Sequence, residues 1–400
     1  MPKLFQINVT ANWGSTGKIA EAIGLAAINH GWESYIAFGR WCNPSQSHVI
    51  KIGNGLSKYL HYVEQRFRDN EGLCSRKDTK RLIRQIDDLK PDIIHLHNIH
   101  DHYLNYEFLF DYLNNTNIKV VWTFHDCWAF TGHCFHFVTK SCEKWKTECF
   151  DCPMKNELPR TILDRSRINY EQKKRLFSGC KNLTVVPCSD WMASFVKESF
   201  LKDKDIQVIK NGVDLNVFKP SSTEDKGKTI ILGVSNAWNK DKGIYDFYRL
   251  RESLDKEKFE ILLVGLKKEQ LKELPYGIVG IERTESVHEL ARLYSSASVL
   301  VNPTYADTFP TVNLEALACG TPVLTYRTGG SPESVSPETG WVVEQGDVEG
   351  LTNIVRSLES RDRKEIAAQR KACRERAERE FDKDKCFEKY IELYDVLIKH

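Results

Sequence analysis

Two carboxylates with a fixed spacing are the clearest candidates for chemistry in this sequence. Asp307 and Glu315 lie eight positions apart. The apolar run at 299–301 predicts a buried parallel strand just before Asp307, and Glu315 stands about a turn and a half into the helix predicted next. Both side chains can therefore border one crevice, where their oxygens would accept hydrogen bonds from the hydroxyl groups of a ligand.

The helix that carries Glu315 is predicted to begin near Pro310, which suits a first helical turn, and to end at Gly320. Leu314 and Leu317 place apolar side chains on one of its faces. Its unpaired N–H groups and the positive end of its dipole favour a phosphate. Hydroxyls on both sides of a diphosphate are the layout of a nucleotide sugar. The alternative is an ordinary strand and helix with two solvated acids.

These residues also carry a family resemblance. Asp307-x7-Glu315-Ala316, followed by Gly320-Thr321-Pro322-Val323, resembles the E-x7-E motif of retaining glycosyltransferases of family 4. Here Asp stands at the first acidic position, and the sequence DTFP is similar to a polysaccharide-biosynthesis branch of that family. The resemblance implies the α/β GT-B fold, in which two Rossmann-like domains face a central cleft.

The same resemblance implies a reaction and a set of donor-site residues. A sugar would pass from a nucleotide-sugar donor to a saccharide hydroxyl, with retention of configuration and with no cofactor required. Asp307 is assigned to hydroxyls of the transferred sugar and is expected to be catalytic, and Glu315 is assigned to the ribose. The helix start that would hold the diphosphate comprises Thr308, Phe309, Pro310 and Thr311.

A second donor-binding loop, SNAWNKDKG, follows the apolar run 230–234. Lys242 and the glycine after it open a predicted helix, so an ammonium and backbone N–H groups come together where a diphosphate can bind. Family members commonly carry Arg and Lys in this loop. Asn236 stands at the Arg position, which makes Lys240 a candidate replacement. Arg283, after a later strand, is a candidate for the base or phosphates of a UDP-, GDP- or ADP-sugar.

A glycine-rich turn at 14–17 separates the first predicted strand from the first predicted helix. It is not a P-loop, because Asn12 and Ile19 stand where that motif needs Gly and Ser or Thr. A bare tight turn is one interpretation. The family resemblance implies instead that the turn lines the crevice, with Gly17 on the donor side and with an acceptor-side group of Gly14, Ser15 and Thr16.

Histidines follow two further predicted strands, at 92–96 and 120–124. Ligands of open α/β sheets bind beyond the carboxyl ends of the strands. His97 and Asp126 are therefore candidates for the acceptor side. A histidine at the position of His125 lies near the reactive sugar in the family, so the resemblance implies a catalytic role for it. A core histidine with satisfied hydrogen bonds is the alternative for each ring.

A cysteine-rich insertion at 133–153 has the spacing Cys134-x7-Cys142-x6-Cys149-x2-Cys152. Three interpretations stay open for these thiols: a structural zinc ion, reduced cysteines packed in a loop, or disulfides. The sequence predicts a loop with little apolar content, whose conformation a bound metal would hold in place. Its place directly after His125 suggests a rigid flap on the acceptor side.

Composition limits the class of protein. The 400 residues exceed what one core usually supports. A net charge of +2, from 57 basic and 55 acidic residues, argues against nucleic-acid binding. No apolar run reaches the length of a membrane span and no signal peptide is recognisable, so we expect a cytoplasmic protein. A basic stripe between 76 and 84 would allow at most peripheral contact at the inner face of the membrane, although a solvated face explains it equally simply.

Together with the family resemblance, these patterns predict three parts of the chain. An N-terminal acceptor-side Rossmann-like domain spans 1–208 and a nucleotide-sugar-binding Rossmann-like domain spans 209–378. The resemblance implies that a C-terminal helix at 379–400 packs back on the first domain. The predicted function is sugar transfer to a saccharide acceptor, which can be lipid-linked, in cell-surface polysaccharide biosynthesis. Two other classes remain: a non-hydrolysing nucleotide-sugar epimerase of the same architecture and a non-catalytic sugar-binding protein.

Overall fold

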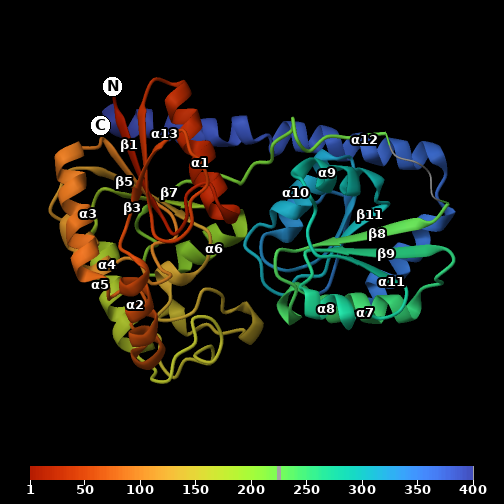
Figure 1. Cartoon of the computed structure of the whole chain (residues 1–400), viewed down its shortest axis with the longest axis horizontal. Coiled ribbons are helices and arrows are strands. Elements are labelled where there is room, and N and C mark those ends of the chain that lie inside the picture. Colours follow the sequence, from red (N-terminus) through yellow and green to blue (C-terminus); the bar gives the residue numbers. More distant parts are fainter. Residues whose placement is uncertain (223–226, 400) are drawn as a thin grey trace. The chain divides into compact units, whose positions relative to one another are not determined.

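The computed structural model describes residues 1–222 and 227–399, which fold into two compact units (Figure 1). Unit 1 comprises Met1–Ile209 together with Phe387–His400, and unit 2 comprises Lys210–Cys386. Each unit is an α/β fold built on its own parallel sheet. A polar linker is expected from the sequence at 221–228, and its central part lies outside the described residues.

The sheet of unit 1 is parallel throughout, with the order β3-β2-β1-β4-β5-β6-β7 in its described residues. Its central strands are buried along nearly their whole length, as expected for parallel strands covered on both faces. The strands are β1 (Lys3–Asn8), β2 (Glu33–Phe38), β3 (His48–Lys51), β4 (Ile93–Leu96), β5 (Lys119–Phe124), β6 (Leu183–Pro187) and β7 (Asp205–Ile206).

Helices join these strands, and all but the second contribute apolar side chains to the buried core of unit 1. They are α1 (Gly14–Asn29), α2 (Gly55–Arg68), α3 (Arg76–Leu89), α4 (Tyr106–Leu113), α5 (Ser166–Gly179) and α6 (Asp190–Glu198). Between β5 and α5 the chain contains only short 3₁₀ turns, η1 (Trp128–Phe130), η2 (Val138–Lys140) and η3 (Lys144–Lys146), within the described residues.

Unit 2 repeats this plan with a parallel sheet of order β10-β9-β8-β11-β12-β13. Its strands are β8 (Thr229–Val234), β9 (Phe259–Val264), β10 (Ile278–Ile281), β11 (Val299–Asn302), β12 (Val323–Tyr326) and β13 (Gly340–Val343). Its helices are α7 (Ile244–Ser253), α8 (Lys268–Lys272), α9 (Val287–Ser296), α10 (Thr311–Ala318), α11 (Val348–Ser357) and α12 (Arg363–Glu380), with 3₁₀ turns η4 (Lys240–Lys242), η5 (Ser331–Ser334) and η6 (Leu358–Ser360).

The last helix, α13 (Lys383–Lys399), returns to unit 1, as the predicted fold class requires (Figure 1). Buried Tyr394 hydrogen-bonds through its hydroxyl to Nδ1 of His95 on β4, at 2.5 Å. Burial raises the pKa of Tyr394 and lowers that of His95, so the tyrosine donates to a neutral ring. Nε2 of His95 then donates to Oγ1 of Thr123, at 2.8 Å, and Tyr390 of α13 bonds to the same hydroxyl.

The predicted elements hold with small corrections. The family resemblance also suggests an interdomain strand at 208–214, and no such strand forms within the described residues. There the N–H of Ile209 donates to the carbonyl of Pro187 at 3.2 Å, and Val213 makes an isolated bridge to Asp382. Pro310 is not inside the first turn of its helix but is the N-cap of α10, with φ −71° and ψ 117°. The helix predicted at Lys242 begins at Ile244, after the 3₁₀ turn η4 and a left-handed Gly243. For the two helices the turn chemistry moves a boundary by a few residues, as is usual at helix ends.

The contact between α13 and β4 gives a stability prediction. Tyr394→Phe would leave a nitrogen of buried His95 without its partner, which costs about 1–3 kcal/mol. We expect the free energy of unfolding, measured by denaturant titration with tryptophan fluorescence, to fall by about this amount. Tyr112→Phe is the matched control, because its hydroxyl donates to Asp87 at 2.8 Å on the solvent side. A control loss as large as that of Tyr394→Phe would contradict the assigned role of the buried contact.

Candidate functional site

The strongest polar contact at the predicted donor site joins Lys242 to Asp307. Nζ of Lys242 lies 2.6 Å from Oδ2 of Asp307 and 3.5 Å from the carbonyl oxygen of Ala306. The two side chains are 34% and 20% exposed, so solvent reaches the pair. Lys242 follows β8 and Asp307 follows β11, which are adjacent in the sheet. Two residues predicted separately for the donor site therefore form one ion pair.

The loops that carry this pair are held together by their backbones. The N–H of Tyr305 donates to the carbonyl of Asp241 at 2.7 Å, and the hydroxyl of Thr304 donates to the same oxygen at 3.2 Å. Gly243 has a φ of +71°, and a Cβ there would lie 2.2 Å from the carbonyl oxygen of Pro303. The glycine after Lys242 is therefore required by its backbone conformation and by the close approach of the other loop.

Glu315 lies on α10 and has a buried partner on the preceding helix. Oε2 of Glu315 accepts a hydrogen bond from the hydroxyl of Tyr294, on α9, at 2.8 Å. Burial and the nearby Glu315 carboxylate raise the pKa of Tyr294 well above its ordinary value, so the phenol stays protonated and acts as the donor. The tyrosine fixes the direction in which the carboxylate points, a role that the sequence analysis did not identify.

A buried polar network fixes α10 against the sheet. Oδ1 of Asn313 accepts from the side-chain amide of Asn302 at 2.9 Å, and its own amide donates to the hydroxyls of Ser331 and Ser334, each at 2.9 Å. The hydroxyls of Ser331 and Thr325 are 2.7 Å apart. Satisfied buried networks of this kind specify one arrangement of the elements that they join. The sequence analysis did not predict this network, because it links residues from four separate elements.

At the start of α10, backbone groups rather than side chains are placed to meet a ligand. Within the described residues no side-chain hydrogen bond caps this helix at Pro310. The carbonyl of Thr308 accepts from the N–H of Gly330 at 3.1 Å, and a Cβ on Gly329 would lie 1.7 Å from the carbonyl oxygen of Asp307. The buried ring of Phe309 packs near Phe381, so only its backbone can meet a ligand. Thr311 is half-buried in the first turn.

The other predicted donor residues lie on the exposed surface of unit 2. Asn236 is in the loop after β8, and Lys240 begins η4. Arg283 follows the edge strand β10, three places from β11 in the sheet order. The structure therefore places Asn236 and Lys240 in the loop of Lys242, but it does not bring Arg283 to the pair of Lys242 and Asp307.

In unit 1 the two predicted histidines form a directed chain of hydrogen bonds. The amide of Gln6 donates to the carbonyl of Ala20, which leaves its oxygen to accept from Nε2 of His97 at 3.0 Å. Nδ1 of His97 must then accept from Nε2 of His125, at 3.1 Å. His125 therefore carries its proton on Nε2 and a lone pair on Nδ1. Desolvation lowers the pKa of His125 to about 4, so its ring is neutral at neutral pH.

Two residues predicted for the acceptor side have protein partners at their polar atoms. His97 is 1% exposed and both ring nitrogens have protein partners, so it positions His125 instead of contacting a substrate. Asp126 accepts from Nε2 of His100 at 2.8 Å and from the backbone N–H of Trp128 at 2.9 Å. Burial would raise the pKa of Asp126, but His100 lowers it to about 2. Asp126 therefore serves as an ionised anchor for the turn that follows β5.

The glycine-rich turn begins α1 as predicted, but Gly17 has a packing reason for being glycine. A Cβ there would lie 2.5 Å from Oγ1 of Thr10. Gly14 has a φ of +66° and open space around its missing Cβ. Ser15 is exposed, and the hydroxyl of Thr16 lies 3.3 Å from the amide of Asn8. Beside this turn two exposed tryptophans, Trp13 and Trp41, have ring centroids 4.6 Å apart, a surface that the sequence analysis did not identify.

The cysteine-rich segment is better packed than its sequence suggested. Phe137 and Trp145 are buried and pack with Phe130 and Phe195, so the expectation of little apolar content was wrong. All four cysteines are free, and the thiols of Cys134 and Cys152 are hydrogen-bonded to each other. Among the described residues, no group of three or more His, Cys, Asp or Glu is arranged to hold a metal ion. The zinc site stays a prediction, and the four thiols are Cys134, Cys142, Cys149 and Cys152.

Family models match both units. A model described as "Glycosyltransferase Family 4" matches residues 21–217, and one described as "Glycosyl transferases group 1" matches residues 228–360. A putative colanic acid biosynthesis glycosyl transferase of Escherichia coli, WcaC, is 24% identical over 377 residues, covering 88% of this chain and 89% of that protein. A protein of Campylobacter jejuni named N,N'-diacetylbacillosaminyl-diphospho-undecaprenol alpha-1,3-N-acetylgalactosaminyltransferase is 26% identical over 228 residues, covering 52% of this chain and 59% of that protein.

Solved structures share the fold over the whole chain. Sucrose-phosphate synthase from Thermosynechococcus elongatus has a TM-score of 0.76 at 18% identity, with 100% of both chains covered. HepE from Anabaena in complex with UDP has a TM-score of 0.65 at 15% identity, with 99% of this chain and 100% of that chain covered. The two family models and these neighbours together identify the chain as a glycosyltransferase with the GT-B fold.

Proposed function

We propose that this glycosyltransferase transfers a sugar from a nucleotide-sugar donor to a saccharide acceptor with retention of configuration, in the biosynthesis of a cell-surface polysaccharide. The observation that carries the proposal is the convergence of Lys242, Asp307 and the backbone at the start of α10 in unit 2. Relatives named for colanic acid biosynthesis and for a lipid-linked acceptor support the substrate class. UDP in the complex of the neighbour HepE supports a nucleotide-sugar donor.

The proposed chemistry depends on stabilising the leaving group. Cleavage of the bond between the sugar and the diphosphate gives a transition state that resembles an oxocarbenium ion, with negative charge growing on the phosphates. The ammonium of Lys242 and the N–H groups at the start of α10 neutralise that charge. When donor binds, Asp307 exchanges its contact with Lys242 for hydroxyls of the transferred sugar. Glu315, oriented by Tyr294, accepts from the ribose hydroxyls.

The directed chain from Gln6 through His97 defines what His125 contributes. A neutral ring with a lone pair on Nδ1 is a hydrogen-bond acceptor on that side, and it donates to His97 on the other. It carries no positive charge at neutral pH, so we assign it to orientation of the sugar and not to electrostatic stabilisation of the phosphates. This assignment makes the contribution of His125 insensitive to pH above its pKa of about 4.

Donor binding is the first test. Isothermal titration of the full chain with UDP-glucose, GDP-mannose and ADP-glucose should give binding of at least one donor. Nuclear magnetic resonance of the product of that donor with saccharide acceptors should show the donor's anomeric configuration. Release of free nucleotide with no acceptor present would favour an epimerase or a hydrolase. Failure of every nucleotide sugar to bind would favour a non-catalytic sugar-binding protein.

Substitutions at the donor site give a quantitative prediction. We expect Lys242→Ala and Glu315→Ala each to lower kcat/KM at least about tenfold, because each removes a charged hydrogen bond worth about 1.5–3 kcal/mol. Circular dichroism should show intact folding. Lys258→Ala is the matched control in unit 2, since it removes a 2.6 Å ion pair with Glu359. Tyr294→Phe separates the loss of orientation from the loss of the Glu315 charge. Wild-type rates in both site variants would refute the donor-site assignment.

A pH series tests the assigned state of His125. We expect His125→Ala to lower turnover roughly tenfold, and by the same factor from about pH 5.5 to 8, because the ring is neutral throughout this range. The rate of nucleotide diphosphate release is the measurement. His30→Ala is the control, since that ring is exposed and pairs with Glu388 at 2.8 Å. A loss that grows as the pH falls through about 6.5 would mean that a protonated His125 carries the catalysis.

We also propose that the four thiols of the cysteine-rich segment bind a structural zinc ion. The supporting observations are the spacing of the cysteines and the contact between the thiols of Cys134 and Cys152. Elemental analysis of the purified protein should give about one zinc per chain, lost in Cys134→Ser and Cys152→Ser. It should be retained in the control Cys42→Ser, which changes an exposed cysteine. Wild-type protein with no zinc and four titratable thiols in this segment would contradict the proposal.

A further inference from the structure

Helix α2 has the reverse of the usual amphipathic arrangement. Of its fourteen residues, all of which the structure describes, the buried ones are His61 and Gln65. Both are polar, and each has a hydrogen-bond partner on the inner side, although Nε2 of His61 has none among the described residues. Nδ1 of His61 bonds to the hydroxyl of Ser75 at 2.9 Å, and the amide of Gln65 donates to the carbonyl of Arg160 at 3.2 Å. A helix on a protein that meets only water normally buries its apolar stripe instead.

Four strongly exposed apolar residues of α2 gather on the opposite face, whereas Tyr62 lies against His102. Relative to Leu56, the other three lie at spacings of three, four and eleven, which places them on one stripe of a helix. They are 55% to 67% exposed. The stripe consists of Leu56, Tyr59, Leu60 and Phe67. Contiguous exposure of large apolar side chains, in contrast to a single exposed leucine, marks an interaction surface.

A neighbouring segment enlarges this stripe. The N–H groups of Ile162 and Leu163 donate to the carbonyls of Arg66 and Phe67, at 2.9 and 3.3 Å, so the segment is fixed to the end of α2. Both parts belong to unit 1 (Figure 1). The segment adds three side chains that are 55% to 72% exposed. We use the name apolar patch for the combined set of Leu56, Tyr59, Leu60, Phe67, Leu158, Ile162 and Leu163.

The charges around the apolar patch are mostly positive. The helix and the segment 158–163 carry four cationic side chains and one carboxylate, Glu64. That carboxylate is already engaged, because it accepts from the amide of Asn70 at 2.9 Å and lies 3.8 Å from Arg68. The cations are Lys58, Arg66, Arg68 and Arg160. Lys58 is two positions from both Leu56 and Leu60, on the side of the helix away from the stripe, so the arginines form the cationic border. An apolar stripe with a cationic border matches the interface of a bilayer that contains anionic lipid.

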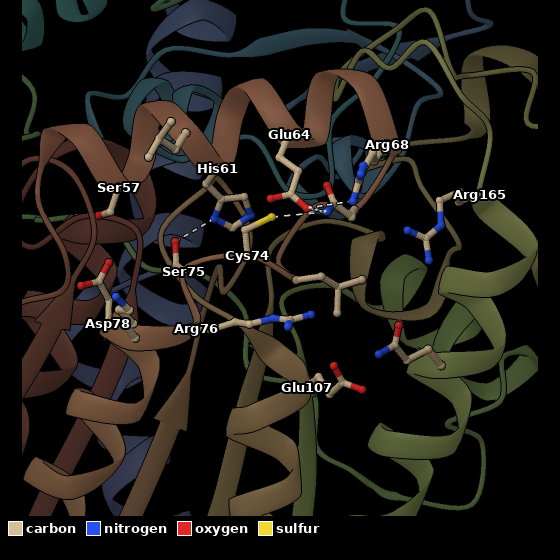
Figure 2. Close-up of a pocket in the computed structure, with 15 residues that line it drawn as sticks. Ser57, His61, Glu64, Arg68, Cys74, Ser75, Arg76, Asp78, Glu107 and Arg165 are labelled. Carbon is tan, nitrogen blue, oxygen red and sulfur yellow. Dashed lines mark hydrogen bonds and ion pairs between the residues drawn. The ribbon is translucent and has the colours of Figure 1, made fainter.

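One side of α2 also borders a hollow of about 620 Å³ (Figure 2). Leu60 and Arg68 of α2 line it, and Figure 2 shows Arg76 and Arg165 reaching into it from neighbouring elements. Its lining also includes the carboxylates Glu64, Asp78 and Glu107, so we assign it no ligand of its own. It extends the cationic border of the apolar patch onto the start of α3.

We propose that the apolar patch docks unit 1 on the surface of an anionic lipid bilayer. The stripe of α2 would lie in the interface with its axis parallel to the membrane, and Tyr59 would sit at headgroup level, as aromatic side chains prefer. The contact is peripheral, since none of the helices in residues 1–222 and 227–399 has the length and apolarity to cross a bilayer. The inference does not rest on the donor site of unit 2.

Vesicle co-sedimentation of the full chain tests this surface. The probes are vesicles of phosphatidylcholine alone and vesicles in which about one quarter of the lipid is phosphatidylglycerol. We expect the wild type to partition onto the anionic vesicles. The double variant Leu60→Glu with Phe67→Glu should have a partition coefficient at least about tenfold lower. Tyr276→Glu is the matched control, because it changes an aromatic side chain that is 85% exposed in unit 2. Arg66→Glu with Arg160→Glu should weaken binding to the anionic vesicles only.

Three outcomes would overturn the proposal. The first is a wild type that stays in the supernatant with both kinds of vesicle. The second is a double variant that partitions as well as the wild type. The third is a wild-type dimer in analytical ultracentrifugation that the double variant abolishes, without vesicle binding by either, which would assign the apolar patch to a second copy of the chain. Nucleotide-sugar titration of the same double variant should match the wild type, so loss of membrane binding and loss of the donor site are distinguishable.

Discussion

A parallel sheet brings the carboxyl ends of all its strands to one edge, and both candidate sites of this protein depend on that constraint. In unit 2, β8 and β11 are neighbours, so the loops that follow them meet and Lys242 reaches Asp307. In unit 1, β1, β4 and β5 are consecutive in the sheet, which lines up Gln6, His97 and His125. Residues far apart in sequence become partners because the strand order allows no other arrangement of their loops.

The alternation of strands and helices followed from local signals in the sequence, whereas the GT-B arrangement of two Rossmann-like domains followed from the family resemblance. Buried apolar strands alternate with helices that have capping residues and glycine stops, and this alternation predicts parallel sheets. The position of Asp307 before a helix and of Lys242 after a strand followed from the same local patterns. The sequence could not supply the pairing of Asp307 with Lys242. The register of one loop against another depends on glycines such as Gly243 and Gly329, whose close contacts appear only in three dimensions.

The roles of buried polar residues were also beyond the sequence. His97 and Asp126 were predicted from their places at strand ends, and those places are correct. Their hydrogen-bond partners decide their roles. The two ring nitrogens of His97 bond to Gln6 and His125, and the carboxylate of Asp126 accepts from His100 and from a backbone N–H. A pattern reveals which side chains reach an edge of the sheet. It does not reveal which of them are saturated by other buried groups and which keep an acceptor for a ligand.

The pair of Lys242 and Asp307 has the right strength for a site that must change partners. Pairs with access to solvent are worth only about 0–1 kcal/mol, because water screens them and fixing long side chains costs entropy. At 34% and 20% exposure, this pair lies near that regime. In the proposed reaction, the donor diphosphate would carry more charge than a carboxylate and would accept stronger hydrogen bonds from the ammonium, so it would displace Asp307 at little cost. The released carboxylate would then meet the sugar hydroxyls, so one exchange would prepare both ends of the bond that breaks.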